Sequence, residues 1–179
     1  MSKKIVYLMR GLPSCGKSYR ARELAGDHGI ICETDQYFYT EVGDNPKAYN
    51  YDDSLLTVAR DWNLTNFRNA VEQQHPIVVV DRGNGLNAET YDYIKIARDL
   101  QYDVQFAEPT SAWWKELRVL LKYRSYVSGE LFDLWADTLA QKNRETHRAK
   151  SSTIRRWMAS WKYDLTVDDV CDAADQGDL

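Results

Sequence analysis

Residues 5–18 read Ile5-Val-Tyr-Leu-Met-Arg-Gly-Leu-Pro-Ser-Cys-Gly-Lys-Ser18. The first five residues of this stretch are a short β-prone apolar run, which predicts a buried strand. The pattern G-x-x-x-x-G-K-S/T fits residues 11–18 at every fixed position, and a helix is predicted from Gly16 to about Ala25, with Gly26 placed to end it. A strand, a glycine-rich turn and a helix in this order predict a βα unit of an α/β fold.

The glycine-rich turn has the residues that a phosphate-binding loop (P-loop) needs. Gly11 lets the chain leave the strand sharply, and Gly16 lets the backbone approach a phosphate without a Cβ. Amides of the loop and of the helix N-terminus favour an anion, Lys17 reaches β- and γ-phosphate oxygens, and the Ser18 hydroxyl is a ligand for Mg²⁺. We therefore predict an ATP or GTP site. Its predicted nucleotide contacts are Gly11, Ser14, Cys15, Gly16, Lys17 and Ser18.

Further strands and helices alternate as far as Pro109. Short apolar runs at 29–32, 77–80 and 104–107 predict strands, and the spacing of apolar residues at 55–74 and 89–100 predicts helices between them. Four consecutive apolar residues at 77–80 indicate a strand that is buried on both faces. The order predicts a mostly parallel sheet with helices on both faces.

Beyond Pro109 only helices are predicted, over 112–127, 130–147 and 152–161. We interpret residues 112–150 as a helical lid region of a single domain that spans residues 1–179, because no linker interrupts the chain. Residues 115–162 carry 11 basic and 5 acidic side chains, whereas residues 163–179 carry six aspartates and no basic residue. The acidic tail at 164–179 is expected to be a frayed end or to associate with the basic block.

Composition excludes several other classes of protein. Hydrophobic residues make up 44 % and charged residues 28 %, as in an ordinary globular domain, and the net charge of −4 argues against coating nucleic acid by bulk charge. No apolar run reaches the ~20 residues that cross a bilayer. The cysteines Cys15, Cys32 and Cys171 match neither a disulfide framework nor a zinc site. We therefore expect a cytoplasmic protein without a membrane partner.

Two aspartates directly follow predicted strands. Ligands of open α/β sheets bind at the carboxyl ends of the strands, so Asp35 is expected near the γ-phosphate, where it can accept the proton of an acceptor hydroxyl; the alternative is a turn cap. Asp81 ends the run 77–80 and is a candidate to hold Mg²⁺ or to contact the acceptor. Arg82 and Asn84 beside it are candidate substrate contacts.

Five segments together resemble the polynucleotide-kinase-like P-loop kinases and, more closely, AAA-type ATP-binding proteins related to 5′-hydroxyl polynucleotide kinase. They are residues 11–18, 34–38, 59–63, 80–84 and 106–110, and the resemblance covers about residues 4–165. It implies an adenylate-kinase-like fold and transfer of the γ-phosphate of ATP, with Mg²⁺, to a 5′-hydroxyl of DNA or RNA. It also implies Lys17 and Ser18 as the ATP and Mg²⁺ contacts, Asp35 as general base, and Asp81 and Asn84 near the acceptor.

The resemblance further implies lid arginines, which neutralise the phosphoryl group during transfer. The candidates are Arg118, Arg124, Arg144 and Arg148, of which Arg144 and Arg148 are favoured as catalytic residues because they flank the lid-like stretch.

The chain departs from the family at three positions. The family usually has glycine, serine and asparagine where this chain has Ser14, Cys15 and Arg82. Ser14 is expected to fit with a negative φ. Cys15 lies near a helix N-terminus, a setting that lowers the pKa of a thiol, although the alternative is an inert small residue.

Three functions remain open. The leading one is a kinase that acts on a 5′-hydroxyl end of DNA or RNA, with aromatic rings between residues 37 and 51 available for base stacking or for packing. The second is a kinase of a small hydroxyl metabolite on the same fold. The third is a regulatory module that binds ATP without transferring phosphate.

Overall fold

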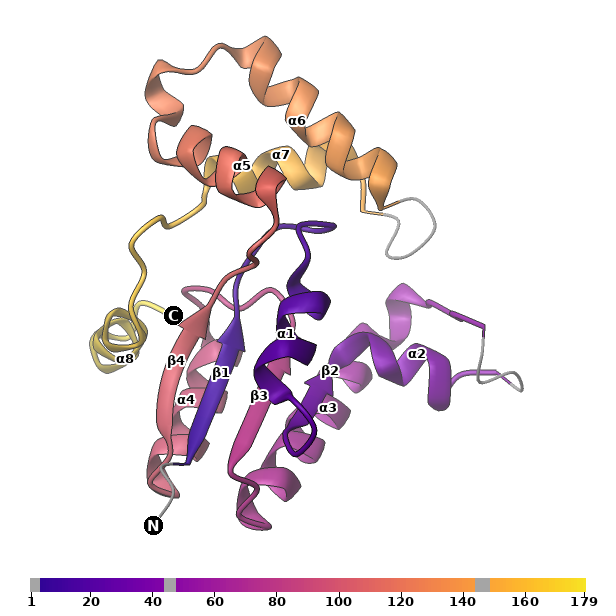
Figure 1. Cartoon of the computed structure of the whole chain (residues 1–179), viewed down its shortest axis with the longest axis vertical. Helices are drawn as coiled ribbons and strands as arrows, with labels where there is room; N and C mark the ends of the chain where they lie inside the picture. The colour runs from indigo at the N-terminus through magenta and orange to yellow at the C-terminus, as the bar shows by residue number, and fades with distance from the viewer. Residues whose placement is uncertain (1–3, 44–47, 144–148) are drawn as a thin grey trace.

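The computed structural model describes residues 4–43, 48–143 and 149–179. Within these residues one parallel sheet contains β1 (Ile5–Met9), β2 (Ile30–Glu33), β3 (Ile77–Asp81) and β4 (Asp103–Ala107) in the order β2-β3-β1-β4. The sheet forms the lower layer of the view in Figure 1. All three strand pairs are parallel, and Val6 lies opposite Val78 on one side and Val104 on the other. The predicted parallel sheet is confirmed.

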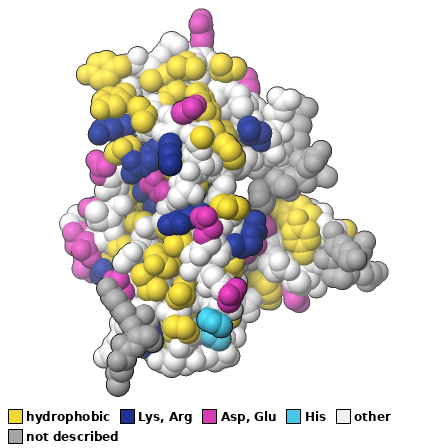
Figure 2. All heavy atoms as spheres, in the orientation of Figure 1, with side chains coloured by type: hydrophobic (Ala, Val, Ile, Leu, Met, Phe, Trp, Pro, Cys, Tyr) yellow, Lys and Arg dark blue, Asp and Glu magenta, His cyan; other side chains and the backbone are white. Residues whose placement is uncertain are grey.

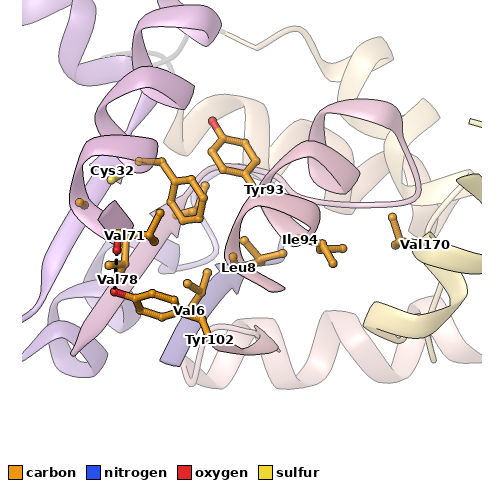
Figure 3. Close-up of a cluster of buried hydrophobic side chains, with 13 residues drawn as sticks. Val6, Leu8, Cys32, Val71, Val78, Tyr93, Ile94, Tyr102 and Val170 are labelled. Carbon is orange, nitrogen blue, oxygen red and sulfur yellow. Dashed lines mark hydrogen bonds between the residues drawn. The ribbon is translucent and has the colours of Figure 1, made fainter. Parts of the chain in front are cut away.

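Helices cover both faces of the sheet, as predicted. Because side chains alternate along a strand, Leu8 faces α3 (Leu56–Glu72) and α4 (Ala88–Asp99), while Met9 faces α1 (Lys17–Ala25). Figure 3 shows Val6, Leu8, Val71, Val78 and Ile94 together in the cluster on the α3–α4 face. The run at 77–80 is apolar throughout because both of its faces are buried.

A second group of helices lies beyond the carboxyl ends of the strands. It contains α5 (Ala112–Lys122), α6 (Gly129–Lys142) and α7 (Ser151–Ala159), and we call it the helical cap (Figure 1). The cap has its own apolar core, in which Trp114 and Trp161 meet edge to face at 5.2 Å. Lysine and arginine side chains appear on the surface where cap and sheet meet (Figure 2). The shorter helix α2 (Tyr37–Thr40) follows β2.

The acidic C-terminal segment is a docked helix, α8 (Val167–Gln176), so the expectation of a frayed end is wrong. Thr166 and Asp169 form a reciprocal capping box at its start, and the Val170 side chain is fully buried against the α4 face of the core. Asp168 pairs with Arg98 of α4 at 2.6 Å rather than with the basic block. The few apolar residues of this segment pack it against the core, and its aspartates remain at the surface.

Replacement Val170→Ala is expected to lower the free energy of unfolding by about 1–3 kcal/mol, because it leaves a cavity between α8 and the sheet layer. The exposed Asp172→Ala variant on the same helix is the matched control and should change stability by less than about 0.5 kcal/mol. Urea unfolding followed by circular dichroism measures both. Equal stability of the two variants would contradict the docking of α8.

Candidate functional site

A cleft with a volume of about 1050 Å³ opens at the carboxyl ends of the strands. Its walls include the loop after β1 (residues 11–18), the end of β2, the loop after β3 and part of the helical cap. In the strand order β2-β3-β1-β4, the chain runs from β1 to β2 at one edge of the sheet and from β3 to β4 at the opposite edge. This is the switch point at which open α/β sheets bind ligands.

The glycine-rich loop (residues 11–18) uses its two fixed glycines as expected. Gly11 has a φ of +149°, and a Cβ there would lie 3.1 Å from the Pro109 ring. Gly16 has a φ of +95° and precedes the first turn of α1, where the described residues offer no side-chain cap. Backbone amides at such a helix start are therefore left for an anion.

Ser14 is in the left-handed region with a φ of +58°, so the expected negative φ is wrong. This conformation is strained for a residue with a Cβ. It is held by the helical cap, because the Trp113 indole Nε1 donates to the Ser14 carbonyl oxygen at 3.0 Å. The helical cap thus contacts the loop at its strained residue.

Cys15 is a buried residue of the glycine-rich loop. Its side chain is fully buried in the apolar core of the cap, and this burial raises the pKa of the thiol to about 12 even though nearby Lys17 opposes the shift. Desolvation is the largest cause of the shift, so the expected lowering of the pKa is wrong and the alternative of an inert small residue is favoured. The Ser111 hydroxyl donates to the Cys15 carbonyl oxygen at 2.8 Å, a second contact from the cap to the loop.

The structure brings Lys17, Ser18, Asp81 and Asp35 together, although three separate segments supply them. Burial lowers the pKa of Lys17, and the negative charges of Asp81 and Asp35 are close enough to oppose this shift. Burial raises the pKa of Asp81, whereas a hydrogen bond with the Ser18 side chain lowers it. The Lys17 ammonium donates to the Leu12 carbonyl oxygen at 2.9 Å, a backbone contact that phosphate oxygens can replace.

The oxygen donors of this group fit Mg²⁺. The Ser18 hydroxyl and the Asp81 carboxylate are adjacent, and no set of three His, Cys, Asp or Glu side chains among the described residues could hold a metal by itself. Mg²⁺ commonly takes one or two protein oxygens and completes its shell with phosphates and water. The site therefore suits a cation that binds with a nucleotide.

Asp35 lies in the short 3-10 turn Thr34–Gln36 directly after β2. The Tyr49 hydroxyl donates to Asp35 Oδ1 at 3.1 Å, and burial together with the Asp35 charge raises the pKa of Tyr49, so the phenol keeps its proton. Phe38 is fully buried, and its ring packs against the rings of Tyr49 and Tyr51. Tyr49 and Tyr51 themselves line the cleft.

Asn84 and Arg82 are both held by protein contacts. Asn84 is 4 % exposed, and its Nδ2 donates to the Met9 carbonyl oxygen at 2.9 Å, which fastens the loop after β3 to the end of β1. Arg82 pairs with Glu89 at 2.6 Å. Both residues line the cleft, and their predicted contact with an acceptor stays a prediction.

Two of the four arginines expected in the lid lie among the described residues. Arg144 and Arg148 lie outside the described residues. Arg118 pairs with Glu108 at 2.5 Å and also contacts the Tyr163 hydroxyl, and Arg124 donates to the Trp161 carbonyl oxygen at 2.8 Å, so both are part of the cap structure.

Sequence reasoning missed several cleft residues that follow no motif. Arg10 is buried, donates to the Lys162 carbonyl oxygen at 2.8 Å and lies 4.4 Å from the Trp161 ring, which ties the segment after α7 to β1. Burial lowers the pKa of Arg10 to about 10, so it remains charged at neutral pH. The other missed residues with charged or indole side chains include Arg22, Glu33, Arg60, Glu89, Trp113, Lys142, Trp157 and Lys162.

No protein-family model matches the chain. Over 113 residues, 62 % of the chain, it is 34 % identical to human NEDD4-binding protein 2, and it spans 6 % of that protein's length. Its fold is similar to a chain in the solved structure of the Pnkp1/Rnl/Hen1 RNA repair complex, with a TM-score of 0.54 and 10 % identity over 88 % of this chain and 44 % of the other. In the described ranges no helix has the length and apolarity to cross a membrane.

Treatment of the folded protein with iodoacetamide at pH 8 is expected to leave Cys15 unmodified, because a thiol with a pKa near 12 is almost entirely protonated there and is also buried. Cys171, which is only partly buried, is the internal control and should react first. Mass spectrometry of peptides measures both, with a denatured sample to show that Cys15 can react. Modification of Cys15 as rapid as that of Cys171 would contradict the buried loop.

Proposed function

We propose that the protein is a P-loop kinase that transfers the γ-phosphate of ATP to the 5′-hydroxyl of a DNA or RNA end. The observation that carries the proposal is the meeting of Lys17, Ser18, Asp81 and Asp35 in one cleft at the switch point of the sheet. An adenylate-kinase-like arrangement of a single domain is part of the proposal. The fold similarity to a chain of an RNA repair complex is consistent with it.

One half of the cleft binds ATP and the other half binds the acceptor. The glycine-rich loop follows β1, and its amides with Lys17 bind the β- and γ-phosphates of ATP. Ser18 and Asp81 hold Mg²⁺, which neutralises phosphate charge when bound. Asp35, after β2, takes the acceptor side together with the loop after β3 that carries Arg82 and Asn84.

Asp35 acts as the general base in the transfer. Its carboxylate accepts the proton of the acceptor hydroxyl, whose oxygen attacks the γ-phosphorus in line with the leaving group. The bond between the γ-phosphorus and the β,γ-bridging oxygen breaks, and ADP leaves with that electron pair. Arg144 and Arg148 are proposed to stabilise the transferring group from the lid, as the resemblance implies.

The cleft is large enough to hold ATP together with an acceptor. Small-molecule sites commonly measure about 300–1,000 Å³, and they enclose most of their ligand. The cleft of this protein, at about 1050 Å³, is at the upper limit of that range and extends from Asp35 to Trp157 of the helical cap. A nucleotide together with an acceptor, such as the end of a nucleic-acid strand, fits these dimensions.

Replacement Asp35→Asn is expected to lower phosphoryl transfer by at least about a hundredfold and to leave ATP affinity within about twofold, because the amide cannot accept the proton. The exposed Asp61→Asn variant of α3 is the control and should retain full activity. Label transfer from γ-labelled ATP and calorimetric titration with an ATP analogue measure the two quantities. Equal losses of transfer and ATP binding would overturn the base assignment.

Replacement Lys17→Met is expected to weaken ATP binding by about tenfold or more, since it removes a charge-assisted contact to phosphate. The exposed Lys95→Met variant of α4 serves as the control. Unchanged ATP affinity of the Lys17 variant in the same titration would show that the nucleotide does not bind at the glycine-rich loop.

A further inference from the structure

The glycine-rich loop contains one residue whose backbone conformation glycine would adopt more readily. Ser14 has a φ of +58°, in the left-handed region that a residue with a Cβ disfavours. Glycine populates this region freely, whereas other residues are disfavoured there by roughly five- to thirtyfold. The loop therefore keeps this shape only where contacts with its surroundings outweigh the preference of Ser14.

Two side chains at the start of α5 make such contacts. The Trp113 indole Nε1 donates to the Ser14 carbonyl oxygen at 3.0 Å, and the Ser111 hydroxyl donates to the Cys15 carbonyl oxygen at 2.8 Å. Ser111 is also the N-cap of α5, so both donors belong to one helix end. Figure 1 shows this end of α5 next to the loop after β1. Two successive peptide groups of the loop are therefore fixed by the same element.

These contacts also set the direction of the loop amides. In a trans peptide group the C=O and the N–H point in opposite directions. The carbonyl groups of Ser14 and Cys15 point toward α5, so the amides of Cys15 and Gly16, which share their planes, point away from it. Gly16 lines the cleft and precedes the first turn of α1, where amides are left for an anion. A change at Trp113 therefore reaches the groups that would bind phosphate.

The Trp113 ring contacts the opposite end of the cap. Lys142, the last residue of α6, has its Nζ 4.9 Å from the ring centre, within the range of a cation–π interaction. The next residue, Asn143, has its Nδ2 3.5 Å from Ser14 Oγ. Trp113 itself is 39 % exposed and lines the cleft, whereas the apolar core of the cap contains its neighbour Trp114. The bond from Trp113 to the loop can therefore be removed without opening the core of the cap.

We propose that Trp113 is a positioning residue for phosphate binding, which holds Ser14 in the left-handed conformation and so keeps the loop amides aimed at the cleft. The inference rests on the proposed function, because the phosphate is that of ATP. Without the indole bond, Ser14 takes a negative φ in most molecules, and the apparent affinity for ATP falls with the fraction of molecules that keep the binding shape. Bound nucleotide restores that shape, so the chemical step keeps its rate.

A double-mutant cycle on Trp113 and Ser14 tests this coupling. Trp113→Phe keeps an aromatic ring but removes the N–H donor, and it should weaken binding of Mg²⁺ with a non-hydrolysable ATP analogue by about fivefold or more. Ser14→Gly alone should stay within about twofold of the native affinity. The double variant should regain most of the lost affinity, because glycine adopts the left-handed region without support. Calorimetric titration of the full chain measures all four proteins.

Ser14→Ala is the matched control for the rescue, because alanine keeps the Cβ and also disfavours the left-handed region. Combined with Trp113→Phe, it should bind the analogue as weakly as Trp113→Phe alone. Tyr126→Phe is the control for loss of a donor from the cap, because Tyr126 is 88 % exposed and does not line the cleft. It should bind as the native protein does. Circular dichroism checks the fold, and Trp113→Leu is a second variant without the donor.

Three results would overturn the inference. They are unchanged affinity of the folded Trp113 variants, failure of glycine at position 14 to restore binding, and equal restoration by glycine and alanine. In turnover, Trp113→Phe should raise the KM for ATP by the same factor as the dissociation constant and leave kcat within about twofold. Loss of kcat with an unchanged KM would contradict the positioning role and leave the kinase intact.

The same measurements separate this inference from the proposed function. Nucleotide binding that follows the expected cycle, without phosphate transfer to any acceptor, would overturn the kinase and support the role of Trp113. Absence of nucleotide binding by the native protein would overturn both.

Discussion

The carbonyl oxygens of Ser14 and Cys15 accept hydrogen bonds from Trp113 and Ser111, which lie at the start of the first cap helix. Leu12 and Cys15 add their side chains to the apolar core of the same cap. The glycine-rich loop is therefore shaped by β1 on one side and by the cap on the other, and it accepts a left-handed Ser14 as a consequence. A loop that is already ordered loses less conformational entropy when it binds a ligand.

Because of the strand order, the glycine-rich loop has neighbours on both sides of the cleft. With β1 central, the loop that follows it borders both the end of β3, where Asp81 contacts Ser18, and the helical cap beyond β4. Asn84 fixes the loop after β3 by donating to the Met9 carbonyl oxygen. Asp35 and the two arginines on Glu89 line the same cleft. Each side of the cleft has its own cations.

The sequence alone predicted the parts that depend on local pattern and on the geometry of parallel strands. Asp35 lies in the turn after β2 and Asp81 ends β3, so their meeting with Lys17 required only that the strands be parallel. Side chains whose roles depend on distant partners could not be assigned in this way. The Ser14 carbonyl oxygen accepts a hydrogen bond from Trp113, the Cys15 side chain is buried in the cap, and the acidic C-terminal segment docks through Val170. Likewise, no sequence pattern shows that Arg82 shares the Glu89 carboxylate with Arg60.

The central claim is tested most directly by offering the native protein γ-labelled ATP, Mg²⁺ and two oligonucleotides that differ only at the 5′ end. One carries a free 5′-hydroxyl and the other a 5′-phosphate. The account predicts that label appears on the first, at a position removed by a 5′-phosphatase, and not on the second. Label on neither oligonucleotide, from a protein that binds ATP tightly, would contradict it.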